Sequence, residues 1–133
     1  MQVRDAMSAT VLTVGPHHTL AEVCKQMAAR KVGAAVVFDA DSEGIGILTE
    51  RDVLEAVAMA KDPATERVSE HRTSNLVFAA PSWSLEQAAD AMLHGGFRHL
   101  IVLDGGEVAG IVSVRDIVRA WNDERRSSDE LVG

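Results

Sequence analysis

Two copies of a short motif hold the side chains best placed to do chemistry. Thr49-x-x-Asp52 and Ser113-x-x-Asp116 each follow an apolar run and precede a segment with helical periodicity. A hydroxyl at a helix N-cap accepts a bond from a free backbone N–H, and the helix dipole favours a carboxylate in the first turn. A helix N-terminus also binds anions, and a carboxylate beside it can accept both hydroxyls of a ribose. The motif therefore predicts either a helix cap alone or a cap that also contacts a nucleotide.

Cationic side chains near these motifs could contact phosphate. Arg51 and Arg115 precede the two aspartates directly, and the second copy adds Arg98 and His99 where we align the first copy's Ala34-Ala35. Charge-assisted bonds from such groups to phosphate are roughly twice as strong as neutral ones. The alternative for Arg98 and His99 is an exposed arginine and a partly buried histidine. In either case we expect the two candidate sites to differ.

The motifs belong to an internal repeat that spans nearly the whole chain. GILTERD at 46–52 matches GIVSVRD at 110–116 with an offset of 64, whereas upstream residues match with an offset of 65. The missing residue falls in a turn, where deletions are tolerated because the backbone is solvated. The upstream matches are Pro16 with Pro81, Leu20 with Leu85, Met27 with Met92, and Asp39 with Asp104.

Each copy predicts the element order strand, helix, strand, strand, helix. The evidence is an apolar run, a capping box before a helical periodicity of apolar residues, two apolar runs around a Gly- and Asp-rich turn, and a final apolar helix. The expected positions are 11–14 and 75–78 for the first strands, helices after Thr19 and Ser84, hairpins at 34–38 with 45–48 and 99–103 with 108–112, and last helices from Asp52 and Asp116.

The repeat suggests a division of the chain into two domains and a tail. We expect a first domain at 1–62, a second at 63–121 and a charged, unpatterned, frayed tail at 122–133, with a polar linker at 61–66. One copy alone has little interior, so two copies related by a pseudo-twofold axis would bury each other's open sheet faces. The expected fold class is α/β (α+β), packed sheet against sheet.

The net charge, the cysteine count and the absence of certain motifs disfavour several classes of function. The net charge of −7 disfavours binding to nucleic acid or to anionic membranes. One cysteine allows no internal disulfide and, with no Cys/His spacing typical of a metal site and no signal-peptide or membrane-spanning run, favours a cytoplasmic protein without a metal. No nucleophile–base pair or pair of catalytic carboxylates stands out, so we do not expect an enzyme.

The duplicated Gly-h-h-Thr/Ser-x-x-Asp motif (h, apolar) resembles that of tandem cystathionine β-synthase (CBS) domains, also called Bateman modules. Gly46 to Asp52 and Gly110 to Asp116 both fit, as do Val14-x-Pro16 and Gly96 to Leu100, and the resemblance covers about residues 1–121. It implies a non-enzymatic regulatory module that binds AMP, ADP, ATP or S-adenosylmethionine in an inter-domain cleft, needs no obligatory cofactor, forms a homodimer and signals to a protein partner.

The resemblance also implies which residues meet the nucleotide. Adenine would lie between apolar walls, the ribose on the aspartates, and the phosphates near the hydroxyls and cations. Which half supplies which part of each site, which ligand is preferred, and whether one or both sites fill stay open, and a ligand-free dimeric scaffold is the alternative function. The expected contacts are Thr13, Val14, Val32, Gly33, Thr49, Arg51, Asp52, Phe78, Ala79, Phe97, Arg98, His99, Ser113, Arg115 and Asp116.

Overall fold

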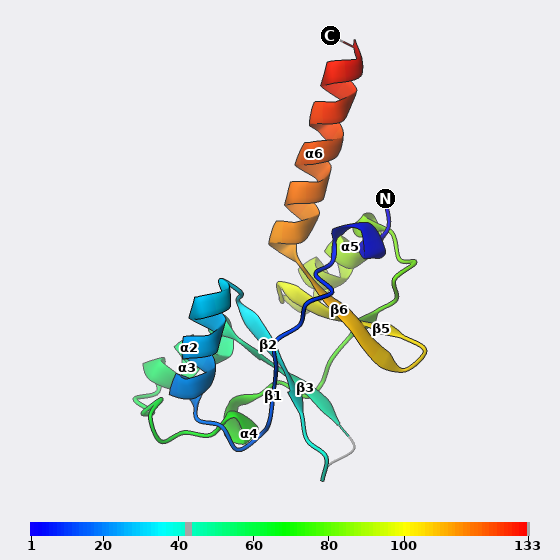
Figure 1. The fold of residues 1–133 in the computed structure, drawn as a ribbon. Coiled ribbons are helices and arrows are strands. Elements are labelled where there is room, and N and C mark those ends of the chain that lie inside the picture. The colour runs from blue at the N-terminus through cyan, green and yellow to red at the C-terminus, as the bar shows by residue number, and fades with distance from the viewer. Residues whose placement is uncertain (42–43, 133) are drawn as a thin grey trace. The chain divides into compact units, whose positions relative to one another are not determined.

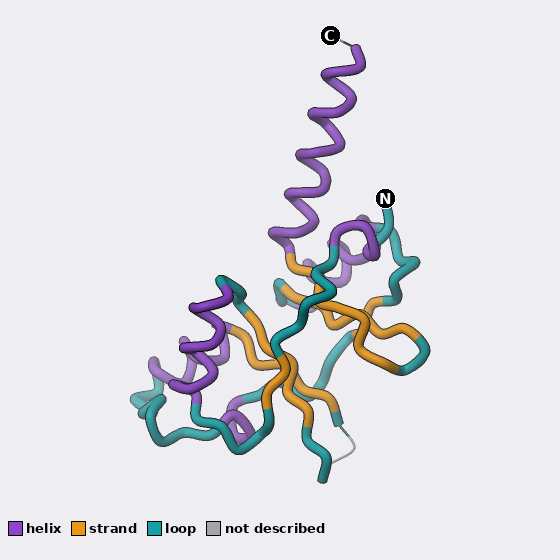
Figure 2. The backbone as a smooth tube through the Cα atoms, viewed as in Figure 1, coloured by secondary structure: helices purple, strands orange, loops and turns teal. Residues whose placement is uncertain are grey.

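The computed structural model describes residues 1–41 and 44–132, with side chains as far as Ser128. The chain forms two compact units (Figure 1). The first-copy unit is Val11–Leu76, and the second-copy unit combines Met1–Thr10 with Val77–Gly133. Each unit holds one three-stranded sheet together with helices (Figure 2), which confirms the predicted α/β (α+β) class.

The two units repeat the same topology. In each, the first strand pairs in parallel with the second, and the second pairs antiparallel with the third. The first-copy unit contains β1 (Thr13–Val14), α2 (Leu20–Arg30), β2 (Ala34–Phe38), β3 (Ile45–Thr49), α3 (Glu50–Ala58) and α4 (Val68–His71). The second-copy unit contains α1 (Val3–Ala6), β4 (Phe78–Ala79), α5 (Leu85–Gly95), β5 (His99–Asp104), β6 (Glu107–Ser113) and α6 (Val114–Val132).

The helices begin where the sequence places hydroxyl caps. Thr19 and Ser84 accept bonds from the backbone N–H groups of Glu22 and Gln87, and the side chain of Gln87 returns the bond to the Ser84 N–H. The carboxylate of Glu22 instead meets His18 Nδ1 at 3.0 Å, and this hydrogen bond lowers the pKa of Glu22. Both predicted helix starts are confirmed, but only the second forms the complete capping box.

The side chains of each sheet point alternately to two faces. One face packs on the helices and forms the core of the unit, and the other is the opposite face of the sheet. In the first-copy unit Ala35, Val37 and Leu48 join the core with residues of α2, and in the second-copy unit Leu100, Val102 and Val112 do so with residues of α5. Successive strand residues point to opposite faces. Ala34, Val36 and Ile47, like His99, Ile101 and Ile111, therefore lie on the opposite face of their sheets.

Two short helices were not predicted. α1 packs against α6 in the second-copy unit, whereas α4, its counterpart in the repeat, packs against α3 in the first-copy unit. Val3 and Val68 are the matching fully buried residues of these helices. The compact units therefore differ from the sequence copies, because each short helix packs on the unit that the other copy mainly forms.

The C-terminal tail differs from the expectation of a frayed segment. α6 runs without a break from Val114 to Val132, so residues 122–132 continue the last helix of the second copy. The tail has few apolar residues, but hydrogen bonding along a helix that has already started costs little nucleation. The last helices also begin at Glu50 and Val114, two residues before the predicted Asp52 and Asp116.

Candidate functional site

The repeated motifs lie where the third strand of each unit leads into the last helix. We call this edge, together with the start of the second strand, the rim. The first-copy rim consists of Gly33, Ala34, Thr49, Arg51 and Asp52, and the second-copy rim consists of Arg98, His99, Ser113, Arg115 and Asp116. Backbone hydrogen bonds of 3.0 Å join the second-strand start to the helix, from Glu50 N–H to the Gly33 carbonyl and from Val114 N–H to the Arg98 carbonyl.

The rim register corrects one alignment made from the sequence. His99 pairs with Ser113 as Ala34 pairs with Thr49, so His99 corresponds to Ala34 and Arg98 to Gly33. The predicted match to Ala34-Ala35 was therefore displaced by one residue, because the deletion lies in the hairpin turn, after these positions. The contrast in charge remains, since the first-copy rim has neither an arginine nor a histidine at the two matching positions.

Asp52 is held by three donors. Its Oδ2 accepts from the Thr49 N–H at 2.9 Å and from the Thr49 hydroxyl at 3.1 Å, and its Oδ1 accepts from the Thr73 hydroxyl at 3.1 Å. Thr49 Oγ1 in turn accepts from the Asp52 N–H, which completes a capping box. Both carboxylate oxygens are therefore engaged within the first-copy unit.

Asp116 has the same cap but a more open second oxygen. Its Oδ2 accepts from the Ser113 N–H at 2.8 Å, and the Asp116 N–H donates to Ser113 Oγ at 3.1 Å. Among the described residues, the partner of its Oδ1 is the exposed Arg119 guanidinium, whose Nη1 lies 3.8 Å away. A solvated ion pair at that distance contributes little, so a ligand hydroxyl can replace it readily.

The rim cations are solvent-exposed. Arg51 pairs with Glu55 on its own helix at 3.4 Å, and Arg115 lies at the matching place on α6. Arg98 is exposed beside the first turn of α6, and His99 is half-buried opposite Ser113. The second-copy unit therefore brings Arg98, His99, Ser113, Arg115 and Asp116 to one edge, as the repeat predicts.

The expected adenine walls divide into two groups. Val14 and Ala79 are buried in the helix-facing cores, so only their backbone groups could meet a ligand. Thr13 and Phe78 occupy the neighbouring positions and pair in register with Val36 and Ile101 on the opposite sheet face. Val32 is exposed. The ring of Phe97 is half-buried, packs against the core of the second-copy unit and lies next to Gly95.

Sequence reasoning missed Thr73, which bonds Asp52 from outside the predicted motif. Thr73 forms an isolated β-bridge with Ile47 of β3, and its repeat counterpart Ser8 forms one with Ile111 of β6. The hydroxyl of Ser8 bonds the Thr10 carbonyl instead. The signal was present in the repeat, because an offset of 65 aligns the two hydroxyl residues, but they lie outside the predicted strands.

The glycines of the repeated motif have a steric role. A Cβ on Gly110 would lie 2.5 Å from the Ser8 carbonyl oxygen, and one on Gly46 would lie 3.3 Å from the Thr73 carbonyl oxygen. A larger residue at Gly110 would force the Ser8 segment to shift, whereas one at Gly46 would require a smaller adjustment of Arg72 and Thr73. The glycines thus allow the close approach that brings Thr73 to Asp52 in the first-copy unit.

Comparison with known proteins agrees with this geometry. The CBS domain family matches residues 3–59 and 68–123. The CBS domain-containing protein YhcV of Bacillus subtilis is 36% identical over 118 residues, covering 86% of this chain and 81% of YhcV. The crystal structure of the CBS-domain protein ATU1752 from Agrobacterium tumefaciens superposes with a TM-score of 0.82 at 37% identity, covering 90% of this chain and 92% of that protein.

Other relatives show a bound ligand and a larger context. The CBS domain protein PAE2072 of Pyrobaculum aerophilum, solved in complex with AMP, has a TM-score of 0.77 at 25% identity, covering 87% of this chain and 89% of that protein. The chain spans only 19% of the Arabidopsis thaliana proteins CBSCBSPB5 and CBSCBSPB4, to which it is 39% identical over 105 residues. No helix in the described part of the chain is long and apolar enough to cross a membrane. With two family matches in register with the two rims, this chain belongs to the CBS domain family as a tandem CBS pair.

Proposed function

We propose that this chain is a regulatory, non-catalytic module that binds an adenosine ligand (AMP, ADP, ATP or S-adenosylmethionine) at its rims and reports its level to a protein partner. The observation that carries the proposal is the duplicated cap, in which a helix N-terminus, a hydroxyl and a carboxylate converge. The helix end favours phosphate, and the carboxylate accepts hydroxyl donors such as those of ribose. The AMP complex of PAE2072 supports this ligand class.

The second-copy rim is the stronger candidate. Asp116 Oδ1 makes no hydrogen bond with the described residues and only a long ion pair with Arg119, while Arg98 and Arg115 add positive charge at the same edge. At the first-copy rim a ribose must share Asp52 with the Thr73 hydroxyl, and the positions matching Arg98 and His99 are Gly33 and Ala34. We therefore expect unequal affinities, with the tighter site at Asp116.

A double-mutant cycle with a modified ligand tests ribose recognition. The wild type and Asp116→Ala are each titrated with AMP and with 2′,3′-dideoxy-AMP, and circular dichroism checks that the variant is folded. The proposal predicts that removing either partner weakens binding and that removing both adds little, because the two changes delete one interaction. Equal losses from the mutation with both ligands would leave Asp116 as a helix cap only.

The apolar residues exposed on the last helices favour a homodimer. Leu54 is 68% exposed and Met59 72% on and after α3, and Trp121 is 39% exposed with Val118 on α6. Apolar surface of this kind on a small protein marks an interaction site. We propose that a second copy covers it, and sedimentation velocity at micromolar concentration should give a dimer that Leu54→Glu weakens.

The ligand-free scaffold would use the same helices without any nucleotide. A ligand that binds only the folded state raises the melting temperature, so AMP, ATP and S-adenosylmethionine are compared in a thermal shift assay. A dimer whose melting temperature none of them changes would favour the scaffold over the nucleotide sensor.

A further inference from the structure

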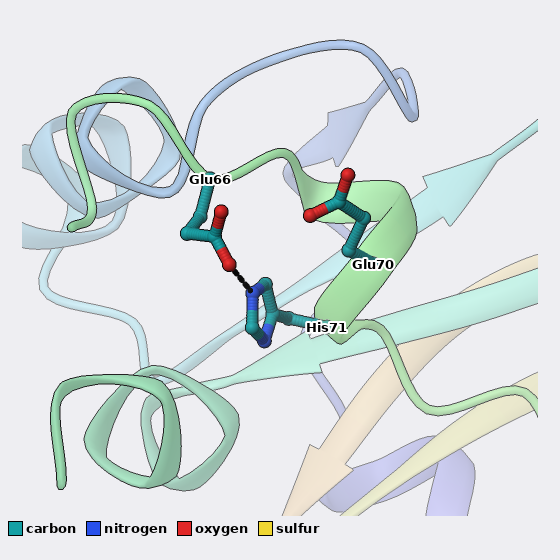
Figure 3. Close-up of side chains that lie close together, drawn as sticks. All are labelled: Glu66, Glu70 and His71. Atoms are coloured by element: carbon teal, nitrogen blue, oxygen red, sulfur yellow. Dashed lines mark hydrogen bonds and ion pairs between the residues drawn. The ribbon is translucent and has the colours of Figure 1, made fainter. Parts of the chain in front are cut away.

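A second cluster of ligand-type side chains lies outside the rims, at α4 of the first-copy unit. Glu66, Glu70 and His71 each place one donor atom so that all three atoms lie within 4.8 Å of one another. Figure 3 shows the group, with Glu66 reaching from the loop before α4 and the other two side chains carried by the helix. The three donors are two carboxylate oxygens and one imidazole nitrogen.

The cluster is partly shielded from solvent. His71 Nε2 lies 3.0 Å from Glu66 Oε1, and the two side chains are only 16% and 21% exposed. Glu70 is exposed and makes no side-chain hydrogen bond or ion pair among the described residues, although its carboxylate lies beside that of Glu66. Two adjacent carboxylates favour a cation between them, because each raises the energy of the other's charge.

The backbone holds these donors firmly. Leu20 N–H donates to the Glu66 carbonyl at 2.9 Å, and Val68 N–H and Ser69 N–H donate to the carbonyls of His18 and Pro16 at 2.9 Å. These bonds fix the loop and α4 against the start of α2. A site on a fixed backbone loses little entropy when it binds, so modest side-chain movements are enough to close it.

From this geometry we propose that Glu66, Glu70 and His71 bind a divalent transition-metal ion of the Zn²⁺ class. Zn²⁺ accepts imidazole nitrogen and carboxylate oxygen, and three protein ligands leave room for water. A nitrogen ligand favours such an ion over Mg²⁺, which prefers oxygen donors and keeps several waters. The search for Cys/His spacing missed the group because two of its ligands are glutamates.

The repeat supplies an internal control. The residues that match Glu66, Glu70 and His71 with the offset of 65 are Met1, Asp5 and Ala6, which include only one ligand-type side chain. α1 and α4 are helices of four residues at matching places in the repeat, with Val3 and Val68 fully buried. We therefore expect one metal ion per chain, at α4 and not at α1.

Titration of the metal-free full chain with ZnCl₂ tests the proposal by calorimetry, and Co²⁺ absorption serves as a spectroscopic probe. One Zn²⁺ should bind per chain, and His71→Ala should weaken binding at least about tenfold, as expected for loss of a metal ligand. Glu70→Gln, an exposed change that removes no described hydrogen bond, should also weaken it, and it decides the matter if His71→Ala does not fold. Asp5→Asn should leave binding unchanged.

Three results would overturn the proposal. The first is a wild type that binds no Zn²⁺. The second is a folded His71→Ala or Glu70→Gln variant that binds Zn²⁺ as the wild type does. The third is loss of binding in His18→Ala, which would move the site to the exposed His18–Glu22 pair.

Discussion

The first-copy and second-copy units share one topology, yet the matching carboxylates of Asp52 and Asp116 have different hydrogen-bond partners. Asp52 is engaged at both oxygens, by Thr49 and by Thr73. Within the described part of the chain, Asp116 is engaged at one oxygen by Ser113, and its other oxygen lies 3.8 Å from Arg119. The second-copy rim also carries Arg98 and His99 in place of Gly33 and Ala34. Duplication has thus preserved the cap while the polar surroundings have diverged.

The short segments before the first strands differ in the same way. Arg72 covers Gly46 in the first-copy unit, where its guanidinium lies 3.5 Å from Asp39, and Met7 covers Gly110 in the second. Nη1 of Arg72 is buried and has no hydrogen-bond partner among residues 1–41 and 44–128. The motif glycine is therefore covered by a charged side chain in the first-copy unit and by an apolar side chain in the second-copy unit.

The largest effect expected is on stability, at these two glycines. Gly110→Ala should lower the free energy of unfolding by about 3 kcal/mol or more, the upper end of the cost of overpacking, because the new Cβ meets a backbone carbonyl at 2.5 Å and the segment must shift. Gly46→Ala is the matched control and should cost less, since its nearest contact is the flexible Arg72 side chain at 3.0 Å. Equal losses in urea unfolding would contradict this contrast.

The next effect concerns ligand affinity at the two aspartates. Asp116→Ala should weaken the tighter nucleotide site by about 1.5–3 kcal/mol, the range for a hydrogen bond to a charged group. Asp52→Ala should change only the weaker site. Calorimetric titration with AMP measures both, and the contrast fails if Asp52→Ala alone removes the tighter binding.

A smaller effect is expected at the hydroxyls beside the third strands. Thr73→Val should destabilise the chain by about 0.5–1.5 kcal/mol, because the Asp52 carboxylate loses one donor while the shape of the side chain is kept. Ser8→Ala should be nearly neutral, since the one bond that its hydroxyl makes to a described residue is the exposed one to the Thr10 carbonyl. Thermal unfolding of the two variants provides the comparison, and a larger loss for Ser8→Ala would refute it.

Local patterns predicted the strands and the long helices well. The caps at Thr19 and Ser84 and the alternation in 34–38 and 99–103 reflect short-range physics, and the structure confirms these elements. The first strands are two residues long instead of four. β1 keeps Thr13–Val14 of the predicted 11–14, whereas β4 is Phe78–Ala79 and shares only Phe78 with the predicted 75–78.

Local patterns could not predict that α1 packs in the second-copy unit and α4 in the first-copy unit. A four-residue helix has no periodicity to detect, and α1 and α4 are held by distant backbone groups, as in the 2.7 Å bond from Val3 N–H to the Trp83 carbonyl. The residues at the rims followed from the repeat, whereas the Thr73–Asp52 bond required the three-dimensional path of the chain. Sequence patterns led to the rim residues as a predicted site, but they did not predict the contacts that distinguish its two copies.

Titration with ATP at low and high salt tests the central claim, that the two rims are unequal nucleotide sites, most directly. The wild type should show a tighter site that weakens with salt, because the rim charges attract the phosphates over a Debye length of about 8–10 Å at ordinary ionic strength and added salt shortens that length. Arg98→Ala should weaken that site selectively, whereas Arg126→Ala, which makes the same change in net charge on the distal part of α6, should not. Two equal sites whose affinities respond neither to salt nor to Arg98→Ala would contradict the account.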